Sequence, residues 1–479
     1  MYHQKPVIGI IAVAKVNHQK DEIRQMLKDY REILKKNTEV EALFPDDVLF
    51  DEHDIIRSAK SMEQGGADAI VFIVGTWIFS SHVISAVQAI HTPFILYGLS
   101  DKIANGNFGA SLQIRYVLQE MGRKFLYIYG PARDEENLGR IIAYGKAAWT
   151  KNAIENKKIA TIGGKCMMMY QTQVNEFSWK RVFGVDFPQY DAVQVFAEMK
   201  NVTDDEAKEV ADRFVKRFDR VVWEEPNTKD KIAPDAILSQ AKMYLAFKRL
   251  KELYDIEVFA NKCMPEMASE IYGYKYAACT ATCLLNEDGI MTACEADLPA
   301  ALSMLILNKL TGKKVFFADI ARLSAQRDRI TFFNCGTAPV SLADRSQPVE
   351  LWPTPSCTAD EGVARRYMTE GADKQRGACV RFDLKPDETV TILRVGGNEG
   401  SLRFHAATAV TCPREVDPEE VLGQRWPGFG LKFAGNIDRF LQNTVGHHYV
   451  LVHGDWTNEL RYLAELFGVS FEYYDGLHG

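Results

Sequence analysis

The sequence predicts an α/β protein with two doubly wound parallel-sheet domains, followed by a β-rich, barrel-like C-terminal domain. Three observations predict it. Short, continuously apolar runs alternate with helical stretches from the first residues onward, as in covered parallel sheets. The same alternation starts again near Lys158. Beyond residue 320, short stretches of alternating polarity are separated by Gly, Pro, Asp and Asn. We therefore expect domains at residues 1–155, 156–320 and 321–479.

The first domain begins with a strand, because Val7–Val13 is apolar throughout. Similar runs and the helical stretches between them follow in strict alternation, which predicts parallel strands joined by right-handed helical crossovers. The further strands are expected at Ala69–Val74, Phe94–Gly98 and Phe125–Gly130, and the helices at Asp21–Lys36, Asp51–Gln64, His82–Ile90, Leu112–Met121 and Asp134–Glu155. No GxGxxG motif follows the first strand, which argues against dinucleotide binding.

The second and third domains differ in their predicted secondary structure. In the second, strands are expected at Lys158–Gly163, Glu257–Ala260 and, as the last strand, Val315–Phe317; helices are expected at Asp204–Phe218, Ala236–Tyr254 and Leu298–Leu310. The third is expected to be rich in strands, at Arg329–Asn334, Ala378–Leu384, Val390–Arg394, Ser401–Val410 and Tyr449–Val452.

The composition limits the classes of partner. The chain of 479 residues is 47% hydrophobic and 25% charged, with a formal net charge of −7. A net negative protein has no general attraction to nucleic acids or anionic lipids. The sequence has no apolar run long enough to span a membrane, and no signal peptide is recognised at the start. We expect a cytoplasmic protein that binds neither nucleic acid nor membrane.

The cysteines predict free thiols. There are nine, they are spread thinly, and no CxxC pair occurs, so neither a disulfide framework nor a thiolate cluster is expected. Cys279 and Cys283 have the spacing of one helix face, which favours two small buried side chains.

Three segments contain residues suited to chemistry. Glu266 follows a short predicted strand, while Glu295 and Asp297 lie just before a predicted helix. Sites in parallel sheets form beyond the carboxyl ends of the strands, so these carboxylates could converge; Asp297 could equally be only a helix N-cap. His447 and His448 are adjacent, so in a strand only one would face a given site. Carboxylates and an imidazole suit Mn²⁺ or Mg²⁺.

Three stretches resemble a known superfamily. They are KCMPE at residues 262–266, the run from Cys283 to Asp319, and HHYVLVHGD at residues 447–455. In these stretches the chain is similar to the L-fucose/L-arabinose isomerases, and most similar to the L-fucose isomerase-like branch. The resemblance implies a metal-dependent aldose–ketose isomerase that acts on a 6-deoxyhexose or pentose through a cis-enediol. It also implies Mn²⁺ as the cofactor, with Mg²⁺ or Co²⁺ as substitutes, and a homohexamer.

The resemblance also implies particular residues. Glu266, Asp297 and His448 match the metal ligands, and Glu266 and Asp297 would be the acid–base pair. In place of Asp297 the ligand could be Glu295, the position that L-arabinose isomerases use, and in place of Glu266 it could be Glu270. Trp77 and Lys262 are expected to bind the sugar.

Two alternatives remain open from the sequence. The first is an isomerase of an anionic aldose, such as a 6-sulfo or 6-phospho sugar, whose tail could be reached by Lys165, Lys180 and Arg181. The second is a non-catalytic sugar-binding protein, which would be inactive and free of metal when purified.

Overall fold

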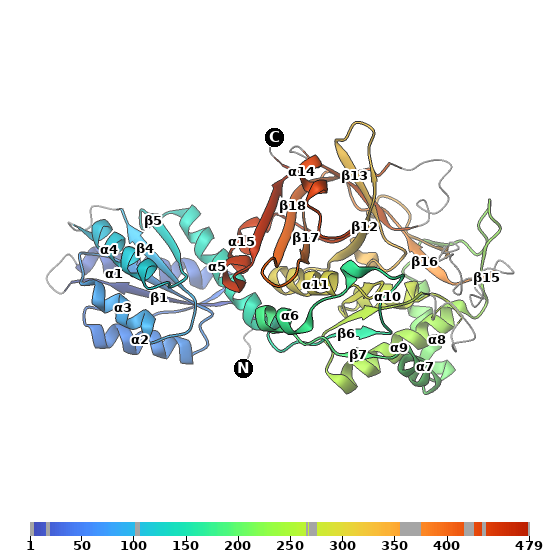
Figure 1. Ribbon diagram of the computed structural model, residues 1–479, viewed down its shortest axis with the longest axis horizontal. Coiled ribbons are helices and arrows are strands. Elements are labelled where there is room, and N and C mark those ends of the chain that lie inside the picture. Colours follow the sequence, from blue (N-terminus) through green and yellow to red (C-terminus); the bar gives the residue numbers. More distant parts are fainter. Residues whose placement is uncertain are drawn as a thin grey trace. The chain divides into compact units, whose positions relative to one another are not determined.

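The structure is a computed structural model of the whole chain, and it describes residues 4–15, 20–100, 106–264, 267, 275–354, 375–415, 426–433 and 437–477 (Figure 1). The chain forms two compact units. Unit 1 contains Met1–Ala153 and Asn458–Gly468, and unit 2 contains Ile154–Thr457 and Val469–Gly479. The division into three domains remains a prediction.

Unit 1 is built on a five-stranded parallel sheet with the strand order β2-β1-β3-β4-β5. This is the order of doubly wound, flavodoxin-like sheets. It confirms the parallel sheet predicted from the apolar runs. The strands are β1 Val7–Val13, β2 Glu41–Leu43, β3 Ala69–Val74, β4 Phe94–Leu99 and β5 Leu126–Gly130; the helices are α1 Lys20–Lys36, α2 Glu52–Gln64, α3 Ser80–Gln88, α4 Asn107–Glu120 and α5 Glu135–Ile154.

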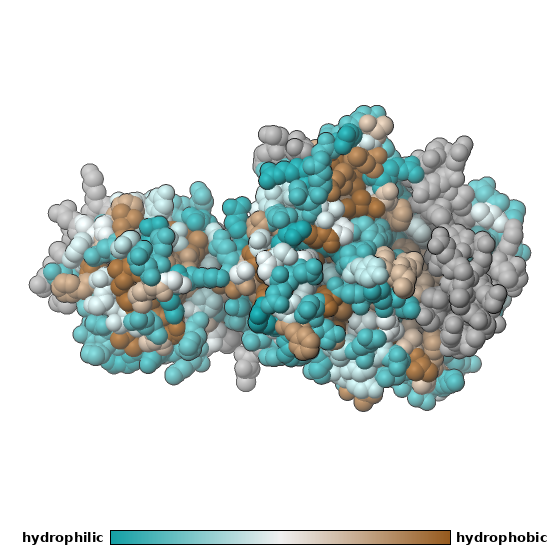
Figure 2. All heavy atoms as spheres, viewed as in Figure 1, coloured by the Kyte–Doolittle hydropathy of each residue, from teal (hydrophilic) through white to brown (hydrophobic). Residues whose placement is uncertain are grey.

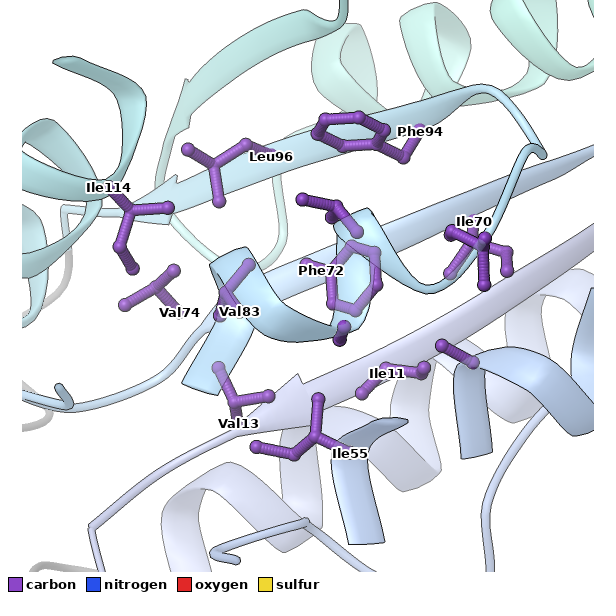
Figure 3. Close-up of a cluster of buried hydrophobic side chains, with 14 of the residues drawn as sticks. Ile11, Val13, Ile55, Ile70, Phe72, Val74, Val83, Phe94, Leu96 and Ile114 are labelled. Atoms are coloured by element: carbon purple, nitrogen blue, oxygen red, sulfur yellow. The ribbon is translucent and has the colours of Figure 1, made fainter. Parts of the chain in front are cut away.

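Buried hydrophobic side chains form a core on one face of this sheet (Figure 3). Phe72 on β3 and Phe94 on β4 meet edge to face, with ring centroids 6.2 Å apart. Ile55, Val83 and Ile114, from α2, α3 and α4, pack against this face. Each such side chain contributes about 1.5–3 kcal/mol when fully buried, so this layer is a main source of the unit's stability.

Helix α15, Thr457–Phe467, completes unit 1 although it comes from the far end of the sequence. Its Tyr462 packs against Tyr144 of α5, with ring centroids 5.6 Å apart. The Tyr462 hydroxyl also accepts a hydrogen bond of 3.2 Å from Arg140 Nε. Sequence periodicity could not predict this return, because it depends on tertiary contacts over more than 300 residues.

Unit 2 contains a four-stranded parallel sheet with the order β11-β10-β6-β7. Its strands are β6 Ile159–Ile162, β7 Gln189–Tyr190, β10 Val258–Asn261 and β11 Thr292–Cys294. The helices of this part are η1 Tyr170–Thr172, α6 Glu176–Phe183, α7 Ala192–Lys200, α8 Asp204–Val215, α9 Ala236–Tyr254, α10 Cys279–Glu287 and α11 Leu298–Thr311.

The rest of unit 2 is a closed antiparallel barrel, which confirms the predicted β-rich part. Six strands run in the order β17-β20-β12-β13-β19-β18, and a pairing between β17 and β18 closes the ring. They are β12 Phe316–Leu323, β13 Arg329–Phe333, β17 Thr389–Gly396, β18 Arg403–Cys412, β19 Gly428–Lys432 and β20 His448–His453. Closure leaves no free sheet edge in the ring.

Smaller elements surround the barrel. Strand β21, Ser470–Asp475, adds to the outside of β18 in parallel. Two small sheets join segments distant in sequence, with the orders β16-β14-β8 and β15-β9. The remaining elements are β8 Arg220–Val221, β9 Lys231–Ile232, β14 Glu350–Pro353, β15 Gln375–Arg376, β16 Ala378–Arg381, η4 Val340–Leu342 and α14 Ile437–Gln442.

One predicted strand belongs elsewhere. Val315–Phe317 was expected to be the last strand of the second parallel sheet, but it is the start of barrel strand β12. The prediction is wrong because β12 pairs antiparallel with β13 and β20, and not with the parallel strands. A short apolar run shows that a strand is buried, but it does not identify the neighbouring strands.

Helix α11 joins the two layers of unit 2. It is buried along most of its length, including Leu302 and Leu305, which are fully enclosed. It packs on the parallel strands β10 and β11 and on the barrel strands β17 and β20 (Figure 1). The helix is apolar around its whole circumference because both sides are covered. Its N-terminus therefore lies where the parallel sheet and the barrel meet.

The surface is mainly polar. Figure 2 shows hydrophilic residues over most of the visible face, with hydrophobic patches between them. Among the described residues, no helix combines the length and the apolar character needed to cross a membrane.

Candidate functional site

The candidate site begins at the turn between β11 and α11. Cys294 is the last residue of β11, and Asp297 is the N-cap of α11. Between them, Glu295 and Ala296 both have left-handed backbone conformations, with φ of 58° and 52°. Such conformations are unfavourable for residues with a Cβ and are concentrated at functional sites. The turn projects Glu295 beyond the carboxyl end of the parallel sheet.

Two barrel strands bring further ligand groups to this place. Asp319 on β12 and His448 on β20 are directly opposite partners in an antiparallel pair. Side chains of opposite partners lie on the same face of a sheet. The pairing of these two strands therefore sets a carboxylate beside an imidazole.

The three side chains converge on His448 Nε2. This atom lies 3.1 Å from Glu295 Oε2 and 3.0 Å from Asp319 Oδ1. Within the part of the chain that the structure describes, it makes no well-directed hydrogen bond, although it is buried. A buried polar atom without such a bond calls for an explanation, and a cation shared with the two oxygens supplies one.

The distances suit a hard cation. Two adjacent ligands that are each about 2.1 Å from an octahedral ion lie about 3.0 Å apart. The charges also fit, since the carboxylates of Glu295, Asp297 and Asp319 all lie against His448, and Arg394 pairs with Asp297. Oxygen and imidazole donors in a negative, largely buried setting match Mn²⁺ or Mg²⁺.

His447 also faces the cluster. Its ring centroid is 3.9 Å from that of His448. One ring nitrogen of each histidine and one carboxylate oxygen each of Glu295 and Asp319 all lie within 4.8 Å of one another. The expectation that only one histidine would face the site is wrong, because β20 begins at His448 and His447 precedes the regular strand. Gln171 Nε2 lies 3.1 Å from His447 Nδ1.

Asp297 is sealed inside this arrangement and has no exposed surface. Its Oδ1 accepts a hydrogen bond of 2.7 Å from the backbone N–H of Ala300, the capping role foreseen from the sequence. Its Oδ2 accepts a 2.9 Å bond from Arg394 and lies 2.6 Å from His448 Nδ1. Both oxygens are therefore engaged with the protein.

Arg394 on β17 is the centre of a buried network. Besides Asp297, it donates to the backbone carbonyls of Gln171, Val445 and His448, at 2.9, 3.1 and 3.0 Å. The guanidinium thus fixes the backbone at Val445, just before the two histidines, and at His448 itself. A planar, permanently charged group with five donors is well suited to such a junction.

The electrostatics separate the two acids of the turn. Burial raises the pKa of Glu295 to about 7, while its contact with His448 opposes this. Burial also opposes ionisation of Asp297, but the charge of Arg394 and the contact with His448 lower the pKa of Asp297 to about 2. Burial lowers the pKa of His448, yet the surrounding carboxylates, Asp319 first, raise it well above its usual value.

Of the other predicted site residues, the structure describes Trp77 and Lys262. Glu266 and Glu270 lie outside the described residues. Trp77 lies in unit 1 between β3 and α3, half-exposed, with its ring against Gly106. Lys262 directly follows β10 in unit 2, and its stem packs on Gly163. It is therefore at the same end of the parallel sheet as Glu295.

The basic residues considered for binding the anionic tail of a sugar differ in the contacts that they make. Lys180 forms an ion pair with Asp186, and Arg181 forms one with Glu399. Lys165 lies close to the end of β6, with its Nζ 4.1 Å from the ring centre of Tyr170. Lys165 and Lys262 thus follow neighbouring strands of one sheet.

Sequence reasoning missed Asp319 as a member of the cluster. A signal was available, since Asp319 comes directly after the apolar run Val315–Ala318. It was overlooked because that run was assigned to the parallel sheet. Knowledge of the β12–β20 pairing is needed to see that Asp319 lies opposite His448.

No family model matches the chain. It is similar to curated proteins named sulfoquinovose isomerase. The protein from Alkalicoccus urumqiensis is 24% identical over 417 residues, covering 84% of this chain and 85% of the relative. The protein from Clostridium sp. (strain MSTE9) is 25% identical over 365 residues, covering 74% and 72%. The protein from Priestia aryabhattai is 20% identical over 440 residues, covering 90% and 91%.

Proposed function

We propose that this chain is a divalent-metal-dependent aldose–ketose isomerase whose substrate is an anionic aldose of the 6-sulfo sugar class. The relatives bear the name of a sugar isomerase, which confirms the prediction of an enzyme of the intramolecular oxidoreductase type. They support the anionic-sugar alternative better than the 6-deoxyhexose or pentose expected first. The proposal includes membership of the L-fucose isomerase-like group, to which the sequence motifs are similar.

The observation that carries the proposal is the convergence of Glu295, Asp319 and His448. We assign these three to the cation, with His447 as a further donor. Asp297, the ligand expected from the motif, is replaced in this role by Glu295, the alternative that the sequence left open. A bound Mn²⁺ would polarise the carbonyl and hydroxyl oxygens of the substrate as negative charge develops.

The carboxylates of Glu295 and Asp319 are suited to moving the proton between C2 and C1. Their side chains retain 16% and 17% exposure, so both can be reached by a small molecule, whereas Asp297 cannot. One carboxylate would take the proton from C2 of the aldose. The other, or the same one, would deliver a proton to C1 of the cis-enediol and so produce the ketose.

Asp297 and Arg394 would act through His448. A carboxylate on the second ring nitrogen fixes the orientation and tautomer of a ligating histidine. Here Asp297 contacts Nδ1, which leaves Nε2 directed at the oxygens of Glu295 and Asp319. Arg394 fixes Asp297 in turn. Both are positioning residues in this proposal.

Lys262 and Lys165 are our candidates for the anionic tail. Both follow strands of the parallel sheet at the end where Glu295 lies. A lysine ammonium near the sugar would favour a sulfonate through its charge without a fixed geometry.

A substrate panel with a metal control tests the proposal. Purified protein is incubated with sulfoquinovose, a 6-phospho aldohexose, L-fucose and L-arabinose, each with Mn²⁺ and with excess chelator, and ketose formation is measured. We expect turnover of the sulfo sugar with Mn²⁺ and none with chelator. Turnover of neutral sugars alone would refute the anionic substrate, and undiminished turnover in chelator would refute the metal dependence.

A further inference from the structure

The structure gathers cysteines that are far apart in sequence, although no thiolate cluster was expected. The Sγ atoms of Cys294 and Cys335 are 3.8 Å apart. Cys263 and Cys279 lie next to this pair, because the first affects the pKa of the Cys294 thiol and the second affects that of the Cys335 thiol. The expectation is wrong because β10, β11, α10 and the segment after β13 each bring one thiol to the same place. None of the four is joined to another by a disulfide.

Cys294 and Cys335 are arranged like two ligands of a thiophilic cation. Two thiolates that are each about 2.3 Å from a tetrahedral zinc ion lie about 3.8 Å apart, which is the separation found here. A third donor is at hand, since one atom each of Cys294, Cys335 and Glu295 lies within 4.8 Å of the others. Cys335 and Glu295 are only partly buried, so a cation can reach the group from outside.

We propose that Cys294, Cys335 and Glu295 form a second metal site, selective for thiophilic divalent cations such as Zn²⁺ and Cd²⁺, beside the site of Glu295, Asp319 and His448. When the cation binds, each of the two thiols releases its proton to solvent and binds as a thiolate. A water molecule or the thiol of Cys263 or Cys279 completes four-coordination. Soft sulfur ligands give this site its preference over Mn²⁺.

The two sites share Glu295 and therefore compete. A cation bound by the thiolates draws the Glu295 carboxylate away from Asp319 and His448. A cation on the thiolates engages the Glu295 carboxylate and places a positive charge beside the oxygen–nitrogen site, which weakens Mn²⁺ binding there. Zinc would thus inhibit the isomerase. This consequence rests on the proposed function, whereas the binding of the cation does not.

The binding is tested with Cd²⁺ alone on the reduced, metal-stripped protein. We expect an ultraviolet thiolate-to-cadmium charge-transfer band that saturates at one equivalent per chain. Cys335→Ser and Cys294→Ser should lose most of this band. Cys412→Ser is the matched control, because its thiol is also partly buried but lies on β18 and outside the cluster, and it should keep the band. Thermal unfolding verifies that each variant is folded.

Asp319→Asn separates this proposal from the proposed function. It removes a ligand of the oxygen–nitrogen site only, so we expect the cadmium band to persist in this variant even though turnover is lost. An absent band in the wild-type protein, or a full band in Cys335→Ser, overturns the second site. If the wild-type protein turns over no sugar but the band behaves as expected, only the proposed function fails.

Inhibition gives a second readout. Isomerase rates are measured at fixed Mn²⁺ with increasing Zn²⁺, each relative to the variant's own zinc-free rate. Loss of one thiolate should raise the zinc concentration for half-inhibition by about 10–100-fold in Cys335→Ser, and leave it unchanged in Cys412→Ser. Equal sensitivity of Cys335→Ser and the wild-type protein would mean that zinc acts only at the oxygen–nitrogen site, and it would overturn the proposal.

Discussion

Glu295 and Asp297 are two residues apart in one turn, but their carboxylates have opposite surroundings. Glu295 has an exposed edge and faces Asp319 and His448. Asp297 is completely buried, and its oxygens are occupied by a backbone N–H, by Arg394 and by His448 Nδ1. The first carboxylate is open to a cation and a substrate, and the second is part of the protein interior.

This difference shows that a sequence motif with several acidic residues does not determine which of them binds a ligand. Which acid binds a ligand depends on how many of its oxygens the fold has already engaged. A carboxylate with all its oxygens paired stabilises the structure, and one with a free oxygen can react.

The largest effect is expected from Glu295→Gln. The change keeps the size of the side chain but removes a ligand charge and a proton-transfer group, so kcat should fall by at least about 1,000-fold. The fold should persist, because this side chain is partly exposed and, among the described residues, its one ion pair is with His448. Steady-state kinetics with saturating Mn²⁺ and thermal unfolding measure the two expectations.

Asp328→Asn provides the matched control, because Asp328 is a partly exposed carboxylate that contacts Ser324 and Arg329 and lies outside the cluster. It should retain normal kcat. If Glu295→Gln keeps near-normal activity while folded and supplied with metal, Glu295 is not the open carboxylate of this turn.

Asp297→Asn should act first on stability. It leaves the guanidinium of Arg394 buried beside a neutral partner, and breaking a buried ion pair on one side costs about 3–5 kcal/mol of unfolding free energy. Manganese affinity should fall by about 10–100-fold, because His448 loses its fixed orientation. Denaturant unfolding and metal titration test this. Unchanged stability with complete loss of turnover would show that Asp297 reacts directly.

The comparison extends to two buried histidines of the barrel, His448 among carboxylates and His405 among aromatic rings. Burial lowers the pKa of His405 to about 4, and the charge of Arg403 adds to this. His405 thus stays neutral in the folded state, while the unfolded chain takes up a proton below about pH 6.5. Its contribution to stability is therefore present above pH 6.5 and is lost as the pH falls toward 4.

The loss should reach about 3 kcal/mol at pH 4, measured as unfolding free energy by denaturant titration at several pH values. His405→Gln should flatten this dependence relative to the wild-type protein. His53→Gln, at an exposed site of α2, should leave it unchanged. An equally steep dependence in His405→Gln would contradict the assignment.

The smallest effect is expected from Lys262→Ala. Removal of one partly exposed ammonium should raise KM for a 6-sulfo sugar by about tenfold, equivalent to about 1.4 kcal/mol, and leave KM for a neutral aldose unchanged. Parallel kinetics on the two sugars provide the measurement. Equal changes in both KM values would show that Lys262 has no part in sensing the anionic tail.

Much of the fold was predictable because its strands are locally distinctive. Val7–Val13 and Ala69–Val74 are apolar at every position, as strands covered on both faces must be, and the structure has them with these bounds. The strand at Val315–Phe317 was recognised but placed in the wrong sheet. Its partner strands β13 and β20 come from later parts of the chain. The residues of the run itself do not indicate which strands will pair with it.

The site was predictable only in part for the same reason. His448 and the acidic turn were recognised, because they follow or begin clear elements. Asp319 was missed, because its relation to His448 exists only in the register of two barrel strands. The exchange of roles that we propose between Glu295 and Asp297 depends on Arg394, which is 97 positions from Asp297 in the sequence. The predictions for Trp77, Lys262 and Glu266 remain predictions.

The placement of α15 has a consequence for biosynthesis. The N-terminal unit takes one of its helices from Asn458–Gly468, and the chain then returns to unit 2 as β21. A nascent chain on the ribosome therefore cannot complete its first unit until residues 458–468 have been synthesised. Until then Tyr144 lacks the packing partner Tyr462, and the surface that α15 will cover is open to chaperones.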